Sequence, residues 1–335
     1  MGTMASASGV PSMHVLVTGA SGFIGRHLVD ALLHEGHRVS CVVRRGSEIP
    51  AALHSGSVER IEIDDIAGDI DWAPRLQGVD SLIHLAARVH VMQESAADPL
   101  ASFRRVNVLG TQRLAEAAVA ARVRRFVYVS SIKVNGESTE HTPFRADDAP
   151  APADPYAVSK WEAERLLWGL AAKSATEVVV VRPPLVYGPG VKGNFARMVH
   201  WVERGLPLPL GAICNRRSLL AVENLVDFLG VCLVHPRAAG EVFLVADGHD
   251  WSTPQLVSAI AAALQRQARL IPVPVGLLTG AAGLLGRRAA MARLCGSLQV
   301  DIAKNRSLLQ WEPPVDPAQA VAQTVRAIVA QAPDD

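Results

Sequence analysis

The chain of 335 residues has few cysteines, few aromatic residues and almost no excess charge. The four cysteines are scattered and form no C-x-x-C pair: Cys41, Cys214, Cys232 and Cys295. This spacing is typical of reduced thiols and argues against a disulfide framework or a zinc ribbon. The formal net charge of +1 gives the chain as a whole no electrostatic reason to bind nucleic acid or an anionic membrane.

The sequence pattern also lacks a metal site and a membrane span. His34 and His37 are neighbours, but no carboxylate or cysteine completes a ligand set around them. Residues 1–12 have neither a basic start nor an apolar core, so we expect a disordered leader rather than a signal peptide. The most apolar run, residues 271–285, is short and broken by prolines and glycines. We therefore expect a cytoplasmic protein with no metal and no membrane insertion.

What is present is the composition of an ordinary globular protein, with 49% apolar and 19% charged residues. Strand and helix patterns alternate through the first half, which predicts an α/β fold with a Rossmann-like, doubly wound parallel sheet. The expected strands are residues 14–18, 38–43, 81–85, 125–130 and 177–181, and the expected helices are 23–35, 98–122 and 154–170. A strand-like segment at 241–246 indicates that the chain returns to this sheet.

A glycine-rich loop connects the first expected strand to the first expected helix. Its glycines, Gly19, Gly22 and Gly25, have the spacing G-x-x-G-x-x-G. Such glycines permit a tight turn, close approach of a pyrophosphate to the backbone, and an anion at the helix N-terminus. The alternative is a turn with a purely structural role.

Arg44 and Arg45 end the second expected strand, where the adenosine ribose of a dinucleotide would lie. An acidic residue there suits the 2′-hydroxyl of NAD, whereas arginine suits the 2′-phosphate of NADP. We therefore expect NADP, with NAD possible, unless both arginines are solvated surface charges. Asp64 is a candidate for a contact near the adenine, with Asp65 and Asp69 as alternatives.

Tyr156 and Lys160 lie four residues apart in an expected helix and so share one face. A free tyrosine has a pKa of about 10, and a cation beside it would favour the phenolate and lower that value. By itself the pair is a common pattern of amphipathic helices. Ser130 and Ser131, at the end of the preceding strand, are what make a proton-transfer site plausible.

Two further polar residues, His84 and Asn107, each have a structural and a functional interpretation. His84 precedes Leu85, Ala86 and Ala87, whose small size would let a dinucleotide approach the backbone. His84 itself has the alternative of a packed histidine. Asn107 interrupts an apolar helical pattern, and its alternative is to satisfy local backbone groups.

Together these motifs resemble the extended short-chain dehydrogenase/reductase family of NAD(P)-dependent epimerases and dehydratases. They run in order as T-G-x-x-G-x-x-G, H-L-A-A, N-V-x-G-T, S-S, Y-x-x-x-K and R-P-x-x-V-Y-G-P, over residues 13–320. By this resemblance, Ser131, Tyr156 and Lys160 are the catalytic set. The resemblance implies cofactor contacts at Gly19, Ser21, Gly22, Phe23, Ile24, Gly25, Arg44, Arg45, Asp64, Leu85, Ala86, Ala87, Asn107, Tyr156, Lys160 and Pro183.

The family resemblance also implies a division of the chain. Residues 13–182, with returns near 213–247, would form the NAD(P)-binding domain, and residues 183–212 and 248–330 a nucleotide-sugar-binding lobe. The substrate residues that the resemblance implies are Lys133, Asn194, Phe195, Arg217 and Arg293. Surface salt bridges are the alternative for the two arginines. Family members often dimerise through two long helices, here residues 98–122 and 154–170.

Within the family, the chain is similar to a branch of UDP-hexose 4-epimerase-like proteins. That branch includes reductases of UDP-4-keto-6-deoxy-N-acetylhexosamine used for surface polysaccharide (O-antigen). Together with Arg44 and Arg45, this similarity favours a 4-keto-reductase acting on a UDP-sugar. The alternative is a C4-epimerase with the same catalytic residues. A more distant alternative is a dinucleotide-sensing protein without catalysis.

Overall fold

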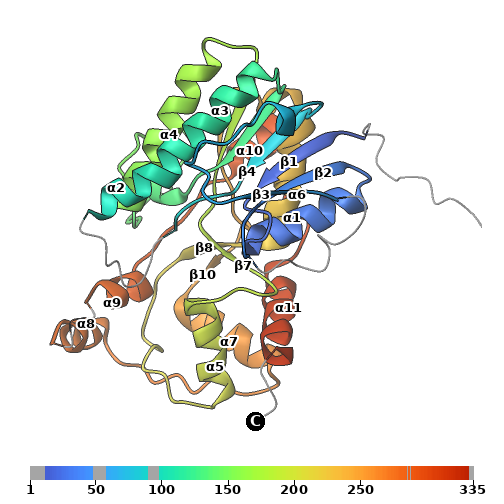
Figure 1. Ribbon diagram of the computed structural model, residues 1–335. Coiled ribbons are helices and arrows are strands. Elements are labelled where there is room, and N and C mark those ends of the chain that lie inside the picture. The colour runs from blue at the N-terminus through green and yellow to red at the C-terminus, as the bar shows by residue number, and fades with distance from the viewer. Residues whose placement is uncertain (1–11, 48–57, 90–97, 285, 287, 332–335) are drawn as a thin grey trace, which may run out of the picture.

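The structure, a computed structural model, describes residues 12–47, 58–89, 98–284, 286 and 288–331 (Figure 1). Apart from Ser12, the expected leader therefore lies outside the described residues. Within the described part of the chain, no helix is long and apolar enough to cross a membrane.

Seven parallel strands form the main sheet, in the order β3-β2-β1-β4-β5-β6-β9. They are β1 (His14–Thr18), β2 (Arg38–Arg44), β3 (Val58–Ile63), β4 (Ser81–His84), β5 (Arg125–Val129), β6 (Glu177–Arg182) and β9 (Val242–Leu244). The order reverses between β1 and β4, so a crevice opens there at the carboxyl ends of the strands. The doubly wound Rossmann-like sheet is confirmed, including the return of the chain at β9.

Helices cover both faces of this sheet (Figure 1). Because both faces are covered, central strands such as β1 are buried along their whole length. One apolar core joins the sheet to α1 (Phe23–His34), α6 (Val222–Val234) and α10 (Ala303–Leu309). A second core joins it to α3 (Thr111–Ala120) and α4 (Pro155–Ala171).

The structure differs from the expected elements at two places. Strand β3 was not expected, because its sequence VERIEI alternates charged residues and it pairs only at the edge of the sheet. The expected helix 98–122 is divided into α2 (Pro99–Phe103), a π-helical segment η3 (Arg104–Gly110) and α3. Hydrophobic periodicity does not distinguish a π-turn from an α-turn, and π-turns are frequent at functional sites.

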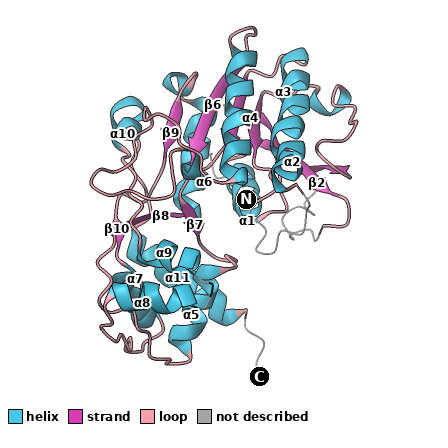
Figure 2. Ribbon diagram, turned by 90° about the vertical axis from the view of Figure 1, so that its left-hand side faces the viewer, coloured by secondary structure: helices cyan, strands magenta, loops and turns pink. Residues whose placement is uncertain are grey.

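A smaller lobe lies beneath the carboxyl ends of the strands (Figure 2). Its sheet has the order β10-β8-β7, and a third apolar core packs α5, α7 and α11 against it. The elements are β7 (Leu185–Tyr187), β8 (Arg217–Ala221), β10 (Asp250–Trp251), α5 (Asn194–Glu203), α7 (Thr253–Ala263), α8 (Val275–Leu284), α9 (Arg288–Cys295) and α11 (Pro317–Ala330). Short 3-10 turns are η2 (Pro74–Leu76), η4 (Ile132–Val134) and η5 (Pro236–Ala238). The exact division of the chain into two domains stays a prediction.

One buried arginine ties two strands of the main sheet to a covering helix. Arg125 in β5 is 1% exposed and donates two hydrogen bonds to the carboxylate of Glu177 in β6, at 2.9 and 2.6 Å. Its Nη1 donates to the carbonyl oxygens of Cys232 and His235 at the end of α6, at 3.0 and 2.8 Å. Arg125 thus supplies the donors that the carboxyl end of α6 lacks within its own helix.

We expect Arg125→Met to lower the free energy of unfolding by about 2–4 kcal/mol, because two carbonyl oxygens and a carboxylate lose their donor. Urea unfolding followed by circular dichroism measures this change. The neighbouring exposed Arg124 provides the control, and Arg124→Met should change stability by no more than about 0.5 kcal/mol. Equal effects of the two substitutions would contradict the anchoring role.

Candidate active site

The predicted cofactor residues converge at the carboxyl ends of the parallel strands. The glycine loop follows β1, Arg44 ends β2, and Asp64 follows β3. Leu85, Ala86 and Ala87 follow β4, Ser131 follows β5 by two residues, and Pro183 follows β6. The fold therefore gathers residues from Gly19 to Pro183, 164 positions apart in sequence, around the crevice between β1 and β4.

The glycine loop leaves no room for a Cβ atom at Gly19 or Gly25, and its geometry fits a dinucleotide. A Cβ on Gly19, which has φ +70°, would lie 2.9 Å from the backbone nitrogen of Ala86. A Cβ on Gly25 would lie 2.2 Å from the carbonyl oxygen of Gly19. Gly22 is the N-cap residue of α1 and has no side chain that could accept a hydrogen bond from the first turn. The backbone N–H groups of that turn are therefore not capped by a side chain. Such N–H groups and the helix dipole favour a pyrophosphate at this place.

Arg45 is paired rather than held ready for a phosphate. Its Nε donates to a carboxylate oxygen of Asp64 at 2.8 Å, and both side chains are well exposed. Arg44 is exposed at the end of β2. The carboxylate of Asp64 offsets much of the positive charge that a 2′-phosphate would need, and its own oxygens could accept a ribose hydroxyl.

His84 is a packed histidine, the structural alternative expected for it. One ring nitrogen hydrogen-bonds to Thr18 Oγ1 at 2.6 Å and the other to Thr111 Oγ1 at 3.0 Å. Burial and the nearby Lys160 lower the pKa of His84 to about 3, so the ring is neutral. Thr18 Oγ1 in turn accepts from the backbone N–H of Ala86 at 3.2 Å, which fixes the segment after β4.

Asn107 holds that same segment from the opposite side. Its carbonyl oxygen accepts from Arg88 N at 2.8 Å, and its amide donates to Arg88 O at 3.1 Å and to Ser159 Oγ at 2.9 Å. The 1% exposed side chain lies in the π-helical segment η3. Asn107 therefore satisfies backbone groups, as the structural alternative proposed, and ties the wall of the crevice to α4. Contact with a cofactor stays a prediction for it.

Ser131 and Tyr156 are brought together at the mouth of the crevice. Ser131 caps the turn η4, its Oγ accepting from Lys133 N at 3.3 Å. Tyr156 is in the first turn of α4, and its ring packs edge-on against Phe103. Burial and the negative charge of Asp154 raise the pKa of Tyr156 to about 12, against the lowering effect of a hydrogen bond with Ser131.

Lys160 lies one turn further along α4 and is 2% exposed. Its Nζ donates to Val129 O at 2.8 Å and lies 4.3 Å from the centre of the Tyr128 ring. Burial lowers the pKa of Lys160 to about 7, although Glu164 acts in the opposite direction. The expected lowering of the tyrosine pKa by this lysine is therefore not met, because burial dominates both groups.

A buried network behind these residues was not predicted. Glu164, which is fully buried, accepts from Arg182 Nε at 3.0 Å, from Arg182 Nη2 at 2.5 Å and from Ser130 Oγ. Arg182 Nη1 also donates to Asn135 Oδ1 at 2.9 Å. The network joins α4, the end of β6 and the loop that carries Ser131. The only sequence signal was a glutamate four residues after Lys160 on the same helical face.

Lys133 is engaged by carboxylates near Ser131. Its Nζ donates to Asp154 and lies 3.7 Å from Glu137 Oε1. Asp154 also caps α4, accepting from Ala157 N at 2.7 Å. Lys133 thus stabilises the N-terminus of the helix that carries Tyr156, and a contact with substrate stays a prediction.

The predicted substrate residues of the lobe fall into two places. Arg217 and Arg293 are brought together, since Arg217 Nη1 donates to Arg293 O at 2.8 Å and to Gly296 O at 3.0 Å. Burial lowers the pKa of Arg217. Asn194 is exposed at the start of α5. The side chain of Phe195 belongs to the lobe core, where it is 3% exposed and stacked 5.3 Å from Tyr187, so its predicted contact with substrate stays a prediction.

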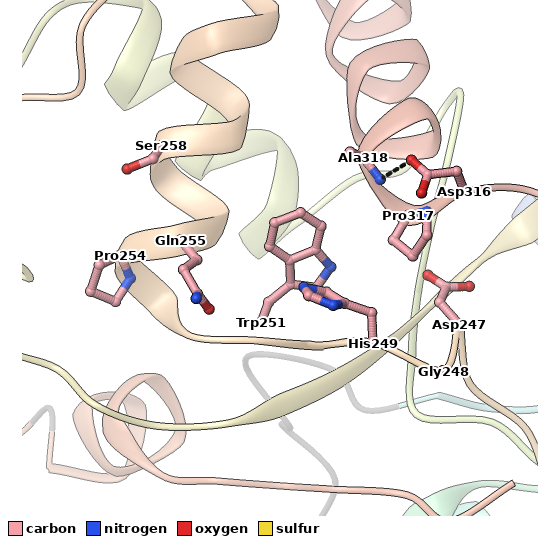
Figure 3. A pocket seen from close by; sticks show the side chains of 10 residues that line it. All are labelled: Asp247, Gly248, His249, Trp251, Pro254, Gln255, Ser258, Asp316, Pro317 and Ala318. Carbon is pink, nitrogen blue, oxygen red and sulfur yellow. Dashed lines mark hydrogen bonds between the residues drawn. The ribbon is translucent and has the colours of Figure 1, made fainter.

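A cavity of about 710 Å³ opens elsewhere, between α7 and α11 (Figure 3). Asp247, His249, Trp251 and Asp316 are among its lining residues, and none of the predicted catalytic residues borders it. The Asp247 carboxylate already accepts from Tyr187, Ala221 N and Asn224 at 2.7–2.9 Å. Asp316 accepts from Ala318 N at the start of α11 (Figure 3). These carboxylates hold the lobe together, and we assign the cavity no catalytic role.

The lowered pKa of Lys160 predicts a pH-dependent stability. Between a folded pKa of about 7 and an unfolded value of about 10.4, the unfolded chain binds one proton more than the folded chain. The free energy of unfolding should therefore rise by about 1.4 kcal/mol for each unit by which the pH rises over this range. This added stability is lost again as the pH falls to 7.

Lys160→Met should remove this contribution, which urea unfolding at pH 7, 8 and 9 measures against the unaltered protein. Lys173, an exposed lysine just after α4, gives the matched control, and Lys173→Met should keep the original pH dependence. An unchanged slope in Lys160→Met would show that the lysine stays charged when buried.

Comparison with known proteins identifies the family of the chain. The model of the NAD dependent epimerase/dehydratase family matches residues 15–246. A UDP-glucose 4-epimerase of Vibrio cholerae is 42% identical over 318 residues, covering 94% of this chain and 95% of that protein. An N-acetyl-alpha-D-glucosaminyl-diphospho-ditrans,octacis-undecaprenol 4-epimerase of Escherichia coli O157:H7 is 27% identical over 311 residues, covering 88% and 89%.

The solved structure of MoeE5 in complex with UDP-glucuronic acid and NAD is also similar. Its TM-score is 0.77 at 28% identity, and the alignment covers 95% of this chain and 100% of that one. The glycine cradle, the Ser131–Tyr156–Lys160 cluster and the matched residues 15–246 lead to one assignment. The chain belongs to the NAD dependent epimerase/dehydratase family.

Proposed function

We propose that this protein is a UDP-hexose or UDP-N-acetylhexosamine C4-epimerase that retains NAD. The proposed chemistry rests on Ser131, Tyr156 and Lys160, which an epimerase and a reductase would share. The similarity to a UDP-glucose 4-epimerase over nearly the whole chain supports the reaction type. The UDP-sugar and NAD bound by MoeE5 support the substrate class and the cofactor.

The residues of the chain would handle the proton of the reaction. Tyr156 Oη would take the proton of the sugar C4 hydroxyl and later return it, and Ser131 would hydrogen-bond the reacting oxygen. Lys160 Nζ, on the same face of α4, would hold the nicotinamide ribose. When bound, the nicotinamide supplies the acceptor and donor of the hydride at C4. For an epimerase, the 4-keto sugar must then present its other face before the proton and hydride return.

The lobe would hold the UDP portion. The guanidinium of Arg217 suits a diphosphate, because its planar fork matches phosphate oxygens. Its hydrogen bonds to Arg293 O and Gly296 O place it against the end of α9. Arg293 and the N-terminal turn of α5 at Asn194 are the neighbouring candidates for substrate contacts.

The ion pair between Arg45 and Asp64 supports NAD over NADP. With Asp64 beside it, the adenosine end of the crevice presents a carboxylate as well as a cation. A carboxylate accepts a ribose hydroxyl and repels a 2′-phosphate.

A 4-keto-reductase of a UDP-4-keto-6-deoxy-N-acetylhexosamine, serving O-antigen synthesis, is the second candidate. Exposed Arg44, at the end of β2, is the observation that favours it, because it adds positive charge where NADP carries its extra phosphate. A cytoplasmic homodimer built on α3 and α4 accompanies either candidate as a further expectation.

Tyr156→Phe removes the proton-transfer group and should lower turnover of UDP-glucose or UDP-N-acetylglucosamine by about 10²–10⁴-fold. Tyr187→Phe is the matched control, since its hydroxyl donates to Asp247 at 2.9 Å in the lobe core. That control should lose about 1 kcal/mol of stability and keep its turnover. A Tyr156→Phe protein with full turnover would rule out the proposed chemistry.

The purified protein should carry tightly bound NAD, and it should interconvert the C4 epimers of its substrate without added nucleotide. Chromatography of the nucleotide released by denaturation and an assay of product epimers test both points. A protein that is empty, and binds NADPH more than tenfold (about 1.4 kcal/mol) more tightly than NADH, would instead support the reductase.

The role of the ion pair can be tested in the same assay. Asp64→Asn leaves Arg45 without its carboxylate and should shift nucleotide preference towards NADP(H). Asp69→Asn changes an exposed acid nearby and should not. The same preference in both variants would remove the ion pair from the argument.

A further inference from the structure

Large apolar side chains are unevenly exposed on this protein. Among the described residues, nine such side chains are exposed, and five of them lie on α5, α8 and the segments beside them. These five are Trp201 (43% exposed), Leu206 (44%), Ile271 (47%), Leu277 (65%) and Leu284 (92%). Two backbone hydrogen bonds of 2.8 Å between Leu208 and the segment 269–271 bring Leu206 and Ile271 onto adjacent segments.

Helix α8 is apolar on every side. Its inner face, with Leu278 and Ala282, is buried, and Leu278 packs into the lobe core. Leu277, Ala281 and Leu284, spaced i, i+4 and i+7, form an exposed face of the same helix. Thr279 is its one polar side chain, and its hydroxyl is bonded to the carbonyl oxygens of Val275 and Gly276. The outer face of α8 therefore offers water no polar side chain of its own.

The sequence around α8 is rich in arginine and contains no acidic residue. Residues 251–300 contain five arginines and no aspartate or glutamate, whereas the whole chain carries a net charge of +1. The rest of the chain is therefore net acidic, and the overall charge conceals a basic segment. Arg266, Arg269 and Arg293 are the exposed arginines of this segment whose side chains the structure describes. α8 lies at the margin of the lobe, away from the main sheet (Figure 1).

We propose that the exposed face of α8 docks on the surface of an anionic lipid bilayer. An apolar helix face flanked by arginines matches such a surface, because the leucines enter the acyl boundary while the cations meet lipid phosphates. The helix has ten residues, too few to cross a bilayer, so it would lie in the interface.

Charge decides between a bilayer and a second copy of this chain. A dimer through α8 would bring two segments of five arginines each together with no carboxylate of these segments between them. Like charges at an interface oppose such an association, whereas anionic headgroups neutralise them. The bilayer is therefore the occupant that both the apolar face and the surrounding charge favour.

The docked orientation would bear on the candidate substrate site. α9 follows α8 directly, and its end is held by Arg217 through Arg293 O and Gly296 O. Docking through α8 would thus place the substrate lobe, rather than the helices α3 and α4, next to the membrane.

Sedimentation with vesicles tests the proposal. Vesicles of phosphatidylglycerol and phosphatidylcholine should bind the full-length protein, whereas vesicles of phosphatidylcholine alone should bind it at least tenfold more weakly. Leu277→Asp/Leu284→Asp should lower the partition coefficient at least tenfold, because a carboxylate does not enter the acyl boundary. Val329→Asp, at a 37% exposed position on α11, is the matched control and should bind like the unaltered protein.

The electrostatic part is tested by Arg266→Gln/Arg269→Gln, which should weaken binding roughly tenfold or more at low salt. Arg122→Gln/Arg237→Gln, at exposed positions of the sheet domain, removes the same charge elsewhere and should have little effect. Equal binding to neutral vesicles, no loss in the leucine variant, or a dimer that the leucine variant abolishes would each overturn the proposal. Circular dichroism and epimerase turnover in solution should be unchanged in all four variants.

Discussion

The buried ion pair between Glu164 and Arg182 is the interaction on which the arrangement of the site depends. A carboxylate without exposure to water is stable only when its charge is paired and its oxygens are hydrogen-bonded. Arg182 and Ser130 meet both conditions here. Since Glu164 lies one turn after Lys160, the pair fixes the position of α4 against β6. Since Ser130 precedes Ser131, it also fixes the loop of the candidate catalytic serine.

The electrostatics of the site follow from the same burial. Desolvation raises the pKa of Tyr156 to about 12 and lowers that of Lys160 to about 7, so the lysine releases its proton before the tyrosine does. At neutral pH Tyr156 is therefore protonated and suited to donate, while Lys160 is poised between its two states. A positive charge brought next to Tyr156 would lower its pKa and make it a base. In this buried site the pKa of Tyr156 thus depends on the charge of the group that is bound next to it.

Sequence reasoning succeeded where the signal was local. β1, the glycine loop and α1 follow from a buried strand, three spaced glycines and an apolar helical face, all within 21 residues. It failed where the partner was distant. The sequence placed Arg45 at the end of a strand and Asp64 near the adenine, but it did not show that the two side chains pair. Strand β3, which positions Asp64, has a charged edge sequence and was not expected. Without that pairing, the sequence favoured NADP.

The same limit applies to Glu164, whose partners are 18 and 34 residues away and lie on other elements. Helical spacing could show that it shares a face with Lys160, but only the packed fold shows that this face is without water.

The sheet domain and the smaller lobe differ in how much of their apolar surface is buried. In the main sheet, helices on both faces bury the strands. In the lobe, α8 is apolar on its buried and on its outer side, and the sequence segment around it, residues 251–300, contains five arginines and no acid. An apolar face invites self-association, but the arginines of residues 251–300 oppose contact with an identical copy. The combination keeps the face available to a partner that is both apolar and anionic, which is the chemistry of a bilayer surface.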